Sequence, residues 1–83
     1  MDRTPEQVIA SARAMDRAVA AGLPGDLLAI MLSARAAWWA EGTGEEVAWP
    51  HPLDLQRILA HPASREVDEV LWRAIRRRVT PRP

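Results

Sequence analysis

The residues of this sequence that could do acid–base or metal chemistry are few, and their spacing does not favour it. His51 and His61 lie ten residues apart, each before a proline. Two metal ligands on one helix face would need a spacing of three or four residues. The chain has no cysteine, so a zinc site would also lack its common sulfur donors. We therefore expect no metal and no cofactor, and we place both histidines in turns.

Nucleophilic catalysis is not supported either. The serines are Ser11, Ser33 and Ser64, and no pattern brings one of them together with a base and an orienting group. Gly42 and Gly44 do not follow a strand and open a helix, as the glycines of a phosphate-binding loop would. The sequence predicts a protein that is not an enzyme and has no catalytic residues.

Basic residues gather near the C-terminus of a chain whose formal net charge is zero. That balance argues against a general attraction to nucleic acid or to a membrane surface. Within residues 72–83 there are five arginines and no acid: Arg73, Arg76, Arg77, Arg78 and Arg82. Cations are favoured at the carboxyl end of a helix, which explains them structurally. Alternatively, Arg73, Arg77 and Arg78 contact phosphate or an acidic partner.

A helix-turn-helix DNA-binding domain is the alternative function. It would use the helices predicted at 52–60 and 64–79, joined by the turn at 61–63, with the Arg-rich end on phosphates. A recognition helix meets the bases with its N-terminal residues. Here those residues include Glu66, Asp68 and Glu69, which DNA phosphates would repel. We therefore rank nucleic acid below a protein as the partner.

An acidic run lies in the middle of the chain. Glu41, Glu45 and Glu46 have no basic residue near them in the sequence. They form either a solvated loop or a surface that attracts the Arg-rich end of another copy, since patches of opposite charge favour association. Self-association is the hypothesis that this charge segregation suggests.

The element that must position all these residues is the stretch from Leu27 to Ala40. Twelve of its fourteen residues are apolar, and only Ser33 and Arg35 interrupt it. A helix that is apolar all round has to be covered on several sides, by flanking segments, by another copy or by a partner. It is shorter than the roughly 20 residues that span a bilayer. The N-terminus carries no signal-peptide pattern, so we expect a soluble, cytoplasmic protein.

The expected fold is all-α, a small helical bundle with three main helices and one short one in a single domain, 1–83. Thr4, Pro5 and Gln7 form a capping box that opens a helix over about 5–21. A short turn at Gly22 leads to the helix at 24–41, so these two form an antiparallel hairpin. The inward residues of the first helix are predicted to be Val8, Ala12, Met15 and Val19.

The short helix is predicted at 52–60 after a loop at 42–51, and the last helix at 64–79 before a tail at 80–83. Pro62 ends the short helix, and Ser64 is expected to cap the last one. The short helix is predicted to turn Leu55, Ile58 and Leu59 inward. The last helix is predicted to turn Val67, Val70, Leu71, Ala74 and Ile75 inward and to end at Thr80-Pro81.

The tryptophans are the candidate binding residues. Trp38 and Trp39 point about 100° apart on a helix, so both cannot enter one core. One of them lies under the 42–51 loop or anchors an interface, since tryptophan is enriched at binding hot spots. Trp72 is predicted to lie off the inward stripe, facing water beside Arg76, whereas Trp49 is expected to fold back onto the helices. The interface candidates are Trp38, Trp39, Trp72 and Arg76.

These features together predict a small protein–protein interaction module. It would be a homo-oligomer, or a subunit, adaptor or inhibitor of a larger protein partner, and it would not bind a membrane.

Overall fold

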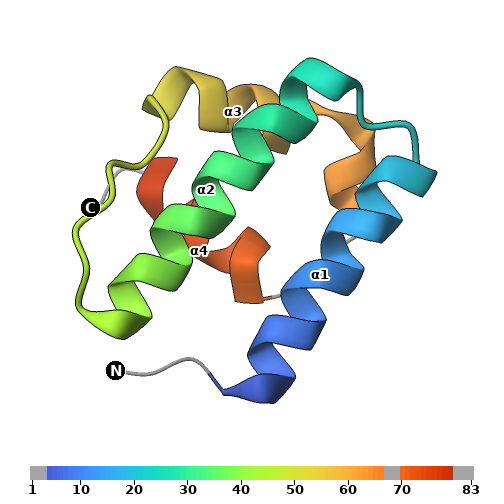
Figure 1. Cartoon of the computed structure of the whole chain (residues 1–83). Coiled ribbons are helices and arrows are strands. Elements are labelled where there is room, and N and C mark those ends of the chain that lie inside the picture. Colours follow the sequence, from blue (N-terminus) through green and yellow to red (C-terminus); the bar gives the residue numbers. More distant parts are fainter. Residues whose placement is uncertain (1–3, 67–69, 80–83) are drawn as a thin grey trace.

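The chain is all-helical in the parts that its computed structural model describes, residues 4–66 and 70–79. No residue of these two ranges forms a strand, and the all-α prediction is confirmed. In chain order the elements are α1 (Pro5–Ala20), α2 (Gly25–Thr43), α3 (Pro52–Ala60), the 3-10 helix η1 (Pro62–Glu66) and α4 (Val70–Val79). They pack into a body of about 32 × 30 × 24 Å (Figure 1).

The longest helix, α2, is packed against all three of the other α-helices. It crosses the front of the molecule in Figure 1, with α1 beside it and with α3 and α4 behind it. The α3 helix also packs on α4, and α1 packs on η1 and α4. The inner side of α2 is therefore covered by its own chain, as its apolar sequence requires, while one outer face is left to solvent.

Helix α1 begins with the predicted capping box. The Thr4 hydroxyl oxygen accepts a hydrogen bond from the Gln7 backbone N–H (3.2 Å), and the Gln7 side-chain oxygen accepts one from the Thr4 N–H (3.1 Å). The two bonds satisfy backbone donors that a helix start otherwise leaves unpaired. This prediction is confirmed.

The predicted inward stripe of α1 is wrong for Ala12 and Val19, whereas Met15 is buried and Val8 is half-buried. The buried residues are Ser11, Ala14, Met15 and Ala18, whereas Val19 is 49% exposed and Ala12 is exposed. The helix is rotated so that its small residues face inward. Small side chains let two helix backbones approach closely, and this advantage outweighs the burial of one more valine.

Ser64 does not begin the last helix, contrary to the prediction. It lies buried within η1, and its Oγ is 2.8 Å from the Leu59 carbonyl oxygen and 2.9 Å from that of His61. Its single hydroxyl hydrogen is therefore shared between the Leu59 carbonyl in the last turn of α3 and that of the C-cap residue His61, which also accepts the Ser64 N–H. The predicted positions Val67 and Thr80-Pro81 lie outside the described residues.

The core is built around two tryptophans. Its largest fully buried side chains include Trp38 of α2, Trp72 of α4, Met31, Leu55 and Ile58. Leu59 packs against this core, half-buried, so the inward residues predicted for the short helix are confirmed.

The expectation that Trp72 faces water is wrong, because its side chain is 0% exposed. Helix α4 packs against α1, α2 and α3, so it is covered over a wider arc than one amphipathic stripe. The buried residues on that arc are Leu71, Trp72, Ala74 and Ile75. A fully buried ring offers no surface to a partner, so neither Trp72 nor Trp38 remains an interface candidate.

Replacing Trp72 by alanine is expected to lower the free energy of unfolding by about 3–5 kcal/mol, because it empties a fully packed site. Urea denaturation followed by far-UV circular dichroism measures this loss. The matched control is Trp39→Ala on a ring that is 42% exposed, which should lose far less stability at the same low protein concentration. Equal losses would contradict the assignment of Trp72 to the core.

Candidate functional site

The outer face of α2 carries no charged side chain. Its exposed residues between the first and last turns are Ala29, Leu32, Ser33, Ala36 and Trp39. Leu32 is 52% exposed and Trp39 is 42% exposed. The solvent side of a surface helix normally carries charged and polar residues, so this uncharged face is a departure from the pattern. We call it the α2 ridge.

The charged residues of α2 are used to hold it in place. The helix has three of them: Asp26, Arg35 and Glu41. Asp26 pairs with Arg57 of α3 at 2.9 Å. Arg35 donates from Nε to the Oγ of Ser11 in α1 at 3.0 Å. Each of these contacts joins α2 to a different helix.

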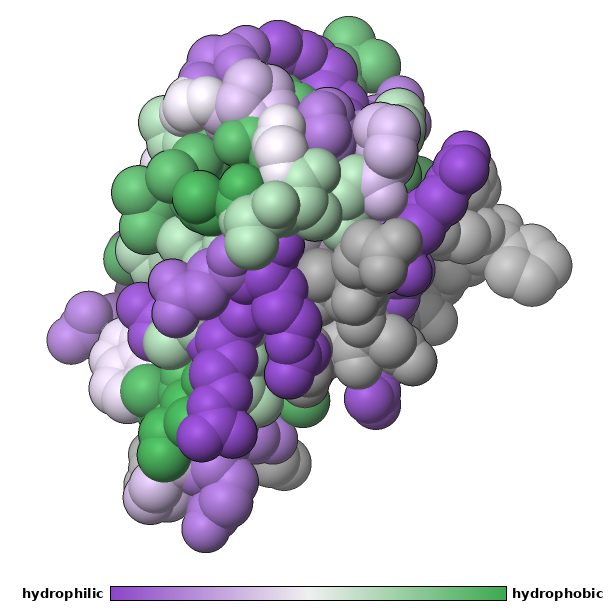
Figure 2. Space-filling model, turned by 90° about the vertical axis from the view of Figure 1, so that its right-hand side faces the viewer, coloured by the Kyte–Doolittle hydropathy of each residue, from purple (hydrophilic) through white to green (hydrophobic). Residues whose placement is uncertain are grey.

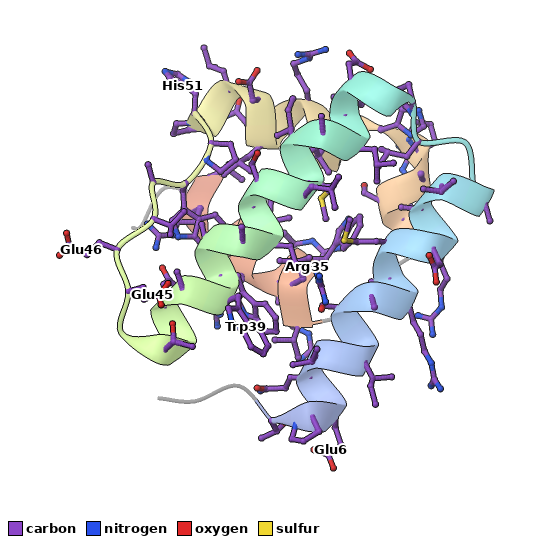
Figure 3. The ribbon with its side chains drawn as sticks, in the orientation of Figure 1. Glu6, Arg35, Trp39, Glu45, Glu46 and His51 are labelled. Atoms are coloured by element: carbon purple, nitrogen blue, oxygen red, sulfur yellow. The ribbon has the colours of Figure 1, made fainter. Side chains whose placement is uncertain are left out.

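One side of the α2 ridge is hollowed. An open hollow of about 510 Å³, which we call the α2 hollow, is lined by Val8 of α1, by Leu32, Arg35, Ala36, Trp39 and Ala40 of α2, and by Glu45 and Val47 of the following loop. Figure 3 shows Arg35 and Trp39 projecting from α2 toward α1, while Glu45 lies on the opposite side of α2. The hollow thus has a basic group on one flank and an acidic group on the other.

The side chain of Arg35 is fixed on the α1 flank. Ser11, which accepts its Nε–H, is fully buried and donates its own hydroxyl to the Val8 carbonyl oxygen at 2.9 Å. Within the described residues, no hydrogen bond or ion pair engages the terminal nitrogens of Arg35. The guanidinium is therefore oriented at one nitrogen and available at the others to a carboxylate.

A second, smaller hollow lies along the ridge. It has a volume of about 390 Å³, and its lining includes Ala29, Ile30 and Ser33 of α2 and Ala48, Trp49 and Pro50 of the loop. The α2 ridge is therefore flanked by depressions. A ridge with a hollow on either side can pack against another helix, because helices pack with the side-chain ridges of one in the grooves of the other.

The neighbouring surface of α1 differs in character. Arg13, Asp16 and Arg17 are exposed there. Figure 2, which looks onto the α1 side, shows hydrophilic residues across the middle of this face, whereas hydrophobic ones gather on its left, toward the face that α2 crosses. Three of the exposed large hydrophobic residues, Leu32, Trp39 and Val47, line the α2 hollow, whereas Ile9 and Val19 are exposed on α1 and Leu53 on α3.

The loop after α2 is attached to the body by a three-residue cluster, which we call the Trp49 cluster. The Trp49 Nε1–H donates to Glu41 Oε2 at 2.9 Å, and Arg78 of α4 pairs with the same carboxylate oxygen. The Arg78 guanidinium also stacks 4.5 Å from the centre of the Trp49 ring, a cation–π contact. The expectation that Trp49 folds back onto the helices is confirmed.

The Trp49 cluster weakens the hypothesis that the acidic run binds the Arg-rich end of another copy. Glu41 and Arg78 form an ion pair within one chain, whereas that hypothesis paired such residues between two copies. Glu45 and Glu46 remain exposed.

The remaining predicted residues lie elsewhere. Arg73 and Arg77 are exposed on α4, and Arg76 is half-buried. His51 and His61 each accept, at Nδ1, the backbone N–H two residues further on, at 3.1 Å. Both histidines lie outside the helices, His51 as the N-cap and His61 as the C-cap of α3.

Within residues 4–66 and 70–79, no group of three or more histidine, aspartate or glutamate side chains could hold a metal ion. None of the helices in that part of the chain is long and apolar enough to cross a membrane.

Several residues of the α2 hollow were missed by sequence reasoning, namely Val8, Leu32, Arg35 and Val47, whereas Glu45 was considered only as part of an acidic run that could attract the Arg-rich end of another copy. The one available signal was Arg35, because a single arginine inside an apolar stretch marks a side of the helix that reaches solvent. The expected return of Trp49 onto the helices gave no sign that Val47 would line a hollow beside α2.

Comparisons of the chain with protein-family models, with curated proteins and with solved structures found no match.

Replacing Glu41 by alanine is expected to free the Trp49 indole. Its N–H should exchange with solvent several-fold faster, because the carboxylate that accepts it is gone, as measured by ¹⁵N NMR of the indole groups. The loss of stability should stay below about 1 kcal/mol, since ion pairs this exposed contribute little. Glu46→Ala, on a neighbouring exposed acid, should leave the exchange unchanged; an unchanged rate in Glu41→Ala would contradict the cluster.

Proposed function

We propose that this protein is a small, non-enzymatic protein–protein interaction module that binds through the α2 ridge and the α2 hollow. It acts as a homo-oligomer, or as a subunit, adaptor or inhibitor of a larger protein partner. The observation that supports this most is the uncharged outer face of α2, with Leu32 and Trp39 about half-exposed beside a hollow. Contiguous exposed apolar surface is a mark of interaction sites.

Trp39 is the proposed anchor of the interface. Its ring lines the hollow, so a partner that fills the hollow removes the rest of the ring from water. Such large, partly pre-buried aromatic residues dominate the energies of many interfaces. Arg35 at the edge of the hollow orients the bound partner, because a carboxylate of the partner can pair with the guanidinium only in a defined geometry.

We propose further that the bundle consists of three main helices and one short helix, and that α1 and α2 form an antiparallel hairpin. In this arrangement α1 supplies one wall of the hollow through Val8.

The helix-turn-helix alternative has less support. Its arginine Arg78 is engaged by Glu41 and by the Trp49 ring, and η1 intervenes between α3 and α4. Protein binding is therefore the function that we place first.

The test compares wild-type protein with Trp39→Ala and with a control, Leu53→Ala. Leu53 is 63% exposed on α3 and does not line the α2 hollow. Untagged protein, purified gently from its source, should have a native mass above the 9.2 kDa of one chain at both low and high salt. Trp39→Ala should weaken that complex about tenfold or more, and Leu53→Ala should not.

Other results would count against the proposal. A complex that dissociates at high salt and is sensitive to nuclease would favour nucleic acid, because phosphate contacts are strongly salt-dependent. A complex that Trp39→Ala and Leu53→Ala affect equally would remove the α2 face as the binding surface.

A further inference from the structure

We propose that the occupant of the α2 hollow is a second copy of this chain, related by a two-fold axis that passes through the floor of the hollow. In this dimer, Arg35 of each protomer faces Glu45 of the other. The inference rests on the proposed function and specifies its partner.

Charge complementarity is the first argument. Arg35 lies on the α1 side of the hollow and Glu45 on the loop side of α2 (Figure 3). A two-fold axis between them exchanges the two sides, so each basic flank lies over an acidic flank. A two-fold interface has to be complementary to itself, and opposite charges on the two sides of one patch meet that requirement.

Both charged groups have capacity for such a contact. Glu45 is exposed, and within residues 4–66 and 70–79 no hydrogen bond or ion pair engages its carboxylate. The terminal nitrogens of Arg35 are likewise not engaged by any described residue, while its Nε is fixed by Ser11. The dimer therefore adds two ion pairs without breaking a bond within either protomer.

Shape is the second argument. Along the α2 ridge the small Ala36 stands between two large residues, Leu32 about one turn before it and Trp39 about one turn after it. The axis that brings Arg35 opposite Glu45 of the other copy lies between these two residues, and therefore nearer to Trp39 than to Ala36 (Figure 3). The Trp39 rings of the two protomers then lie close to each other across the axis, and apolar surface is buried on both sides.

The absence of charge on the ridge also favours a second copy. A ridge without charged residues meets its own copy without burying an unpaired charge, which would be costly. The other self-association that the sequence suggested, Glu41 with an Arg-rich end, is less favoured, since Glu41 and Arg78 pair within one chain.

The test is a pair of charge reversals, Arg35→Glu and Glu45→Arg, examined separately and mixed. Wild-type protein should reach twice the 9.2 kDa chain mass with increasing concentration in analytical ultracentrifugation. Each reversal alone places like charges opposite each other twice, and should raise the dimer Kd about tenfold or more. Mixed in equal amounts, the two variants should form a heterodimer, because both contacts then join opposite charges.

Glu46→Arg is the matched control. It makes the same change of charge one residue away, at an exposed acid that does not line the α2 hollow, and it should leave the dimer Kd nearly unchanged. Because Arg35→Glu removes the bond to Ser11, its fold is checked by circular dichroism. Should that variant not fold, the comparison of Glu45→Arg with Glu46→Arg decides the question.

The outcomes separate this inference from the proposed function. A wild-type chain that stays monomeric at all concentrations would overturn the dimer, and so would a dimer that Glu46→Arg weakens as much as Glu45→Arg does. The proposed function would survive either result if a complex with a different protein were still weakened by Trp39→Ala and not by Leu53→Ala. Loss of both effects would overturn both proposals.

Discussion

The structure depends on the need to cover a helix that is apolar almost all round. Between its ends α2 presents large apolar side chains such as Met31 and Trp38 inward, and it takes three other α-helices to bury them. Burial of a large apolar side chain stabilises a fold by about 1.5–3 kcal/mol, far more than an exposed ion pair does. The bundle is therefore stabilised mainly by the inner side of α2.

Polar contacts have a different role in this fold, since they set where the neighbours of α2 lie. Each of the three charged residues of α2 is bound to another part of the chain: Asp26 to α3, Arg35 to α1, and Glu41 to the loop and α4. Apolar packing is not directional, whereas hydrogen bonds and ion pairs have a defined geometry. With its charges placed in this way, the exposed ridge of α2 carries none, and only the terminal nitrogens of Arg35 remain available beside it.

The sequence could predict the features that depend on local chemistry. The capping box at Thr4 follows from residue types at fixed spacing, and the return of Trp49 onto the helices was also expected. The inward face of α1 could not be predicted in the same way. Its orientation depends on how closely the neighbouring elements approach Ala14 and Ala18, and that distance is a property of the assembled bundle.

The positions of Trp72 and Ser64 could not be predicted either, because both depend on how the helices pack. A single inward stripe is the right expectation for a helix covered on one side, but α4 is covered on three, so a residue off the stripe is also buried. Ser64 has the residue type of a helix start, yet its hydroxyl satisfies the end of the preceding helix. The α2 hollow was beyond prediction because its walls come from separate parts of the chain.

The Trp49 cluster links two parts of the molecule that are distant in sequence. Arg78 lies in the last turn of α4, and Trp49 lies two residues after Val47, which forms a wall of the α2 hollow. Ordering of the last turn of α4 is therefore coupled to ordering of the Val47 wall of the hollow, so that each favours the other. By thermodynamic reciprocity, a molecule that binds in the hollow and steadies its wall also protects the end of α4 from fraying, by the same free energy with which an ordered α4 end favours binding.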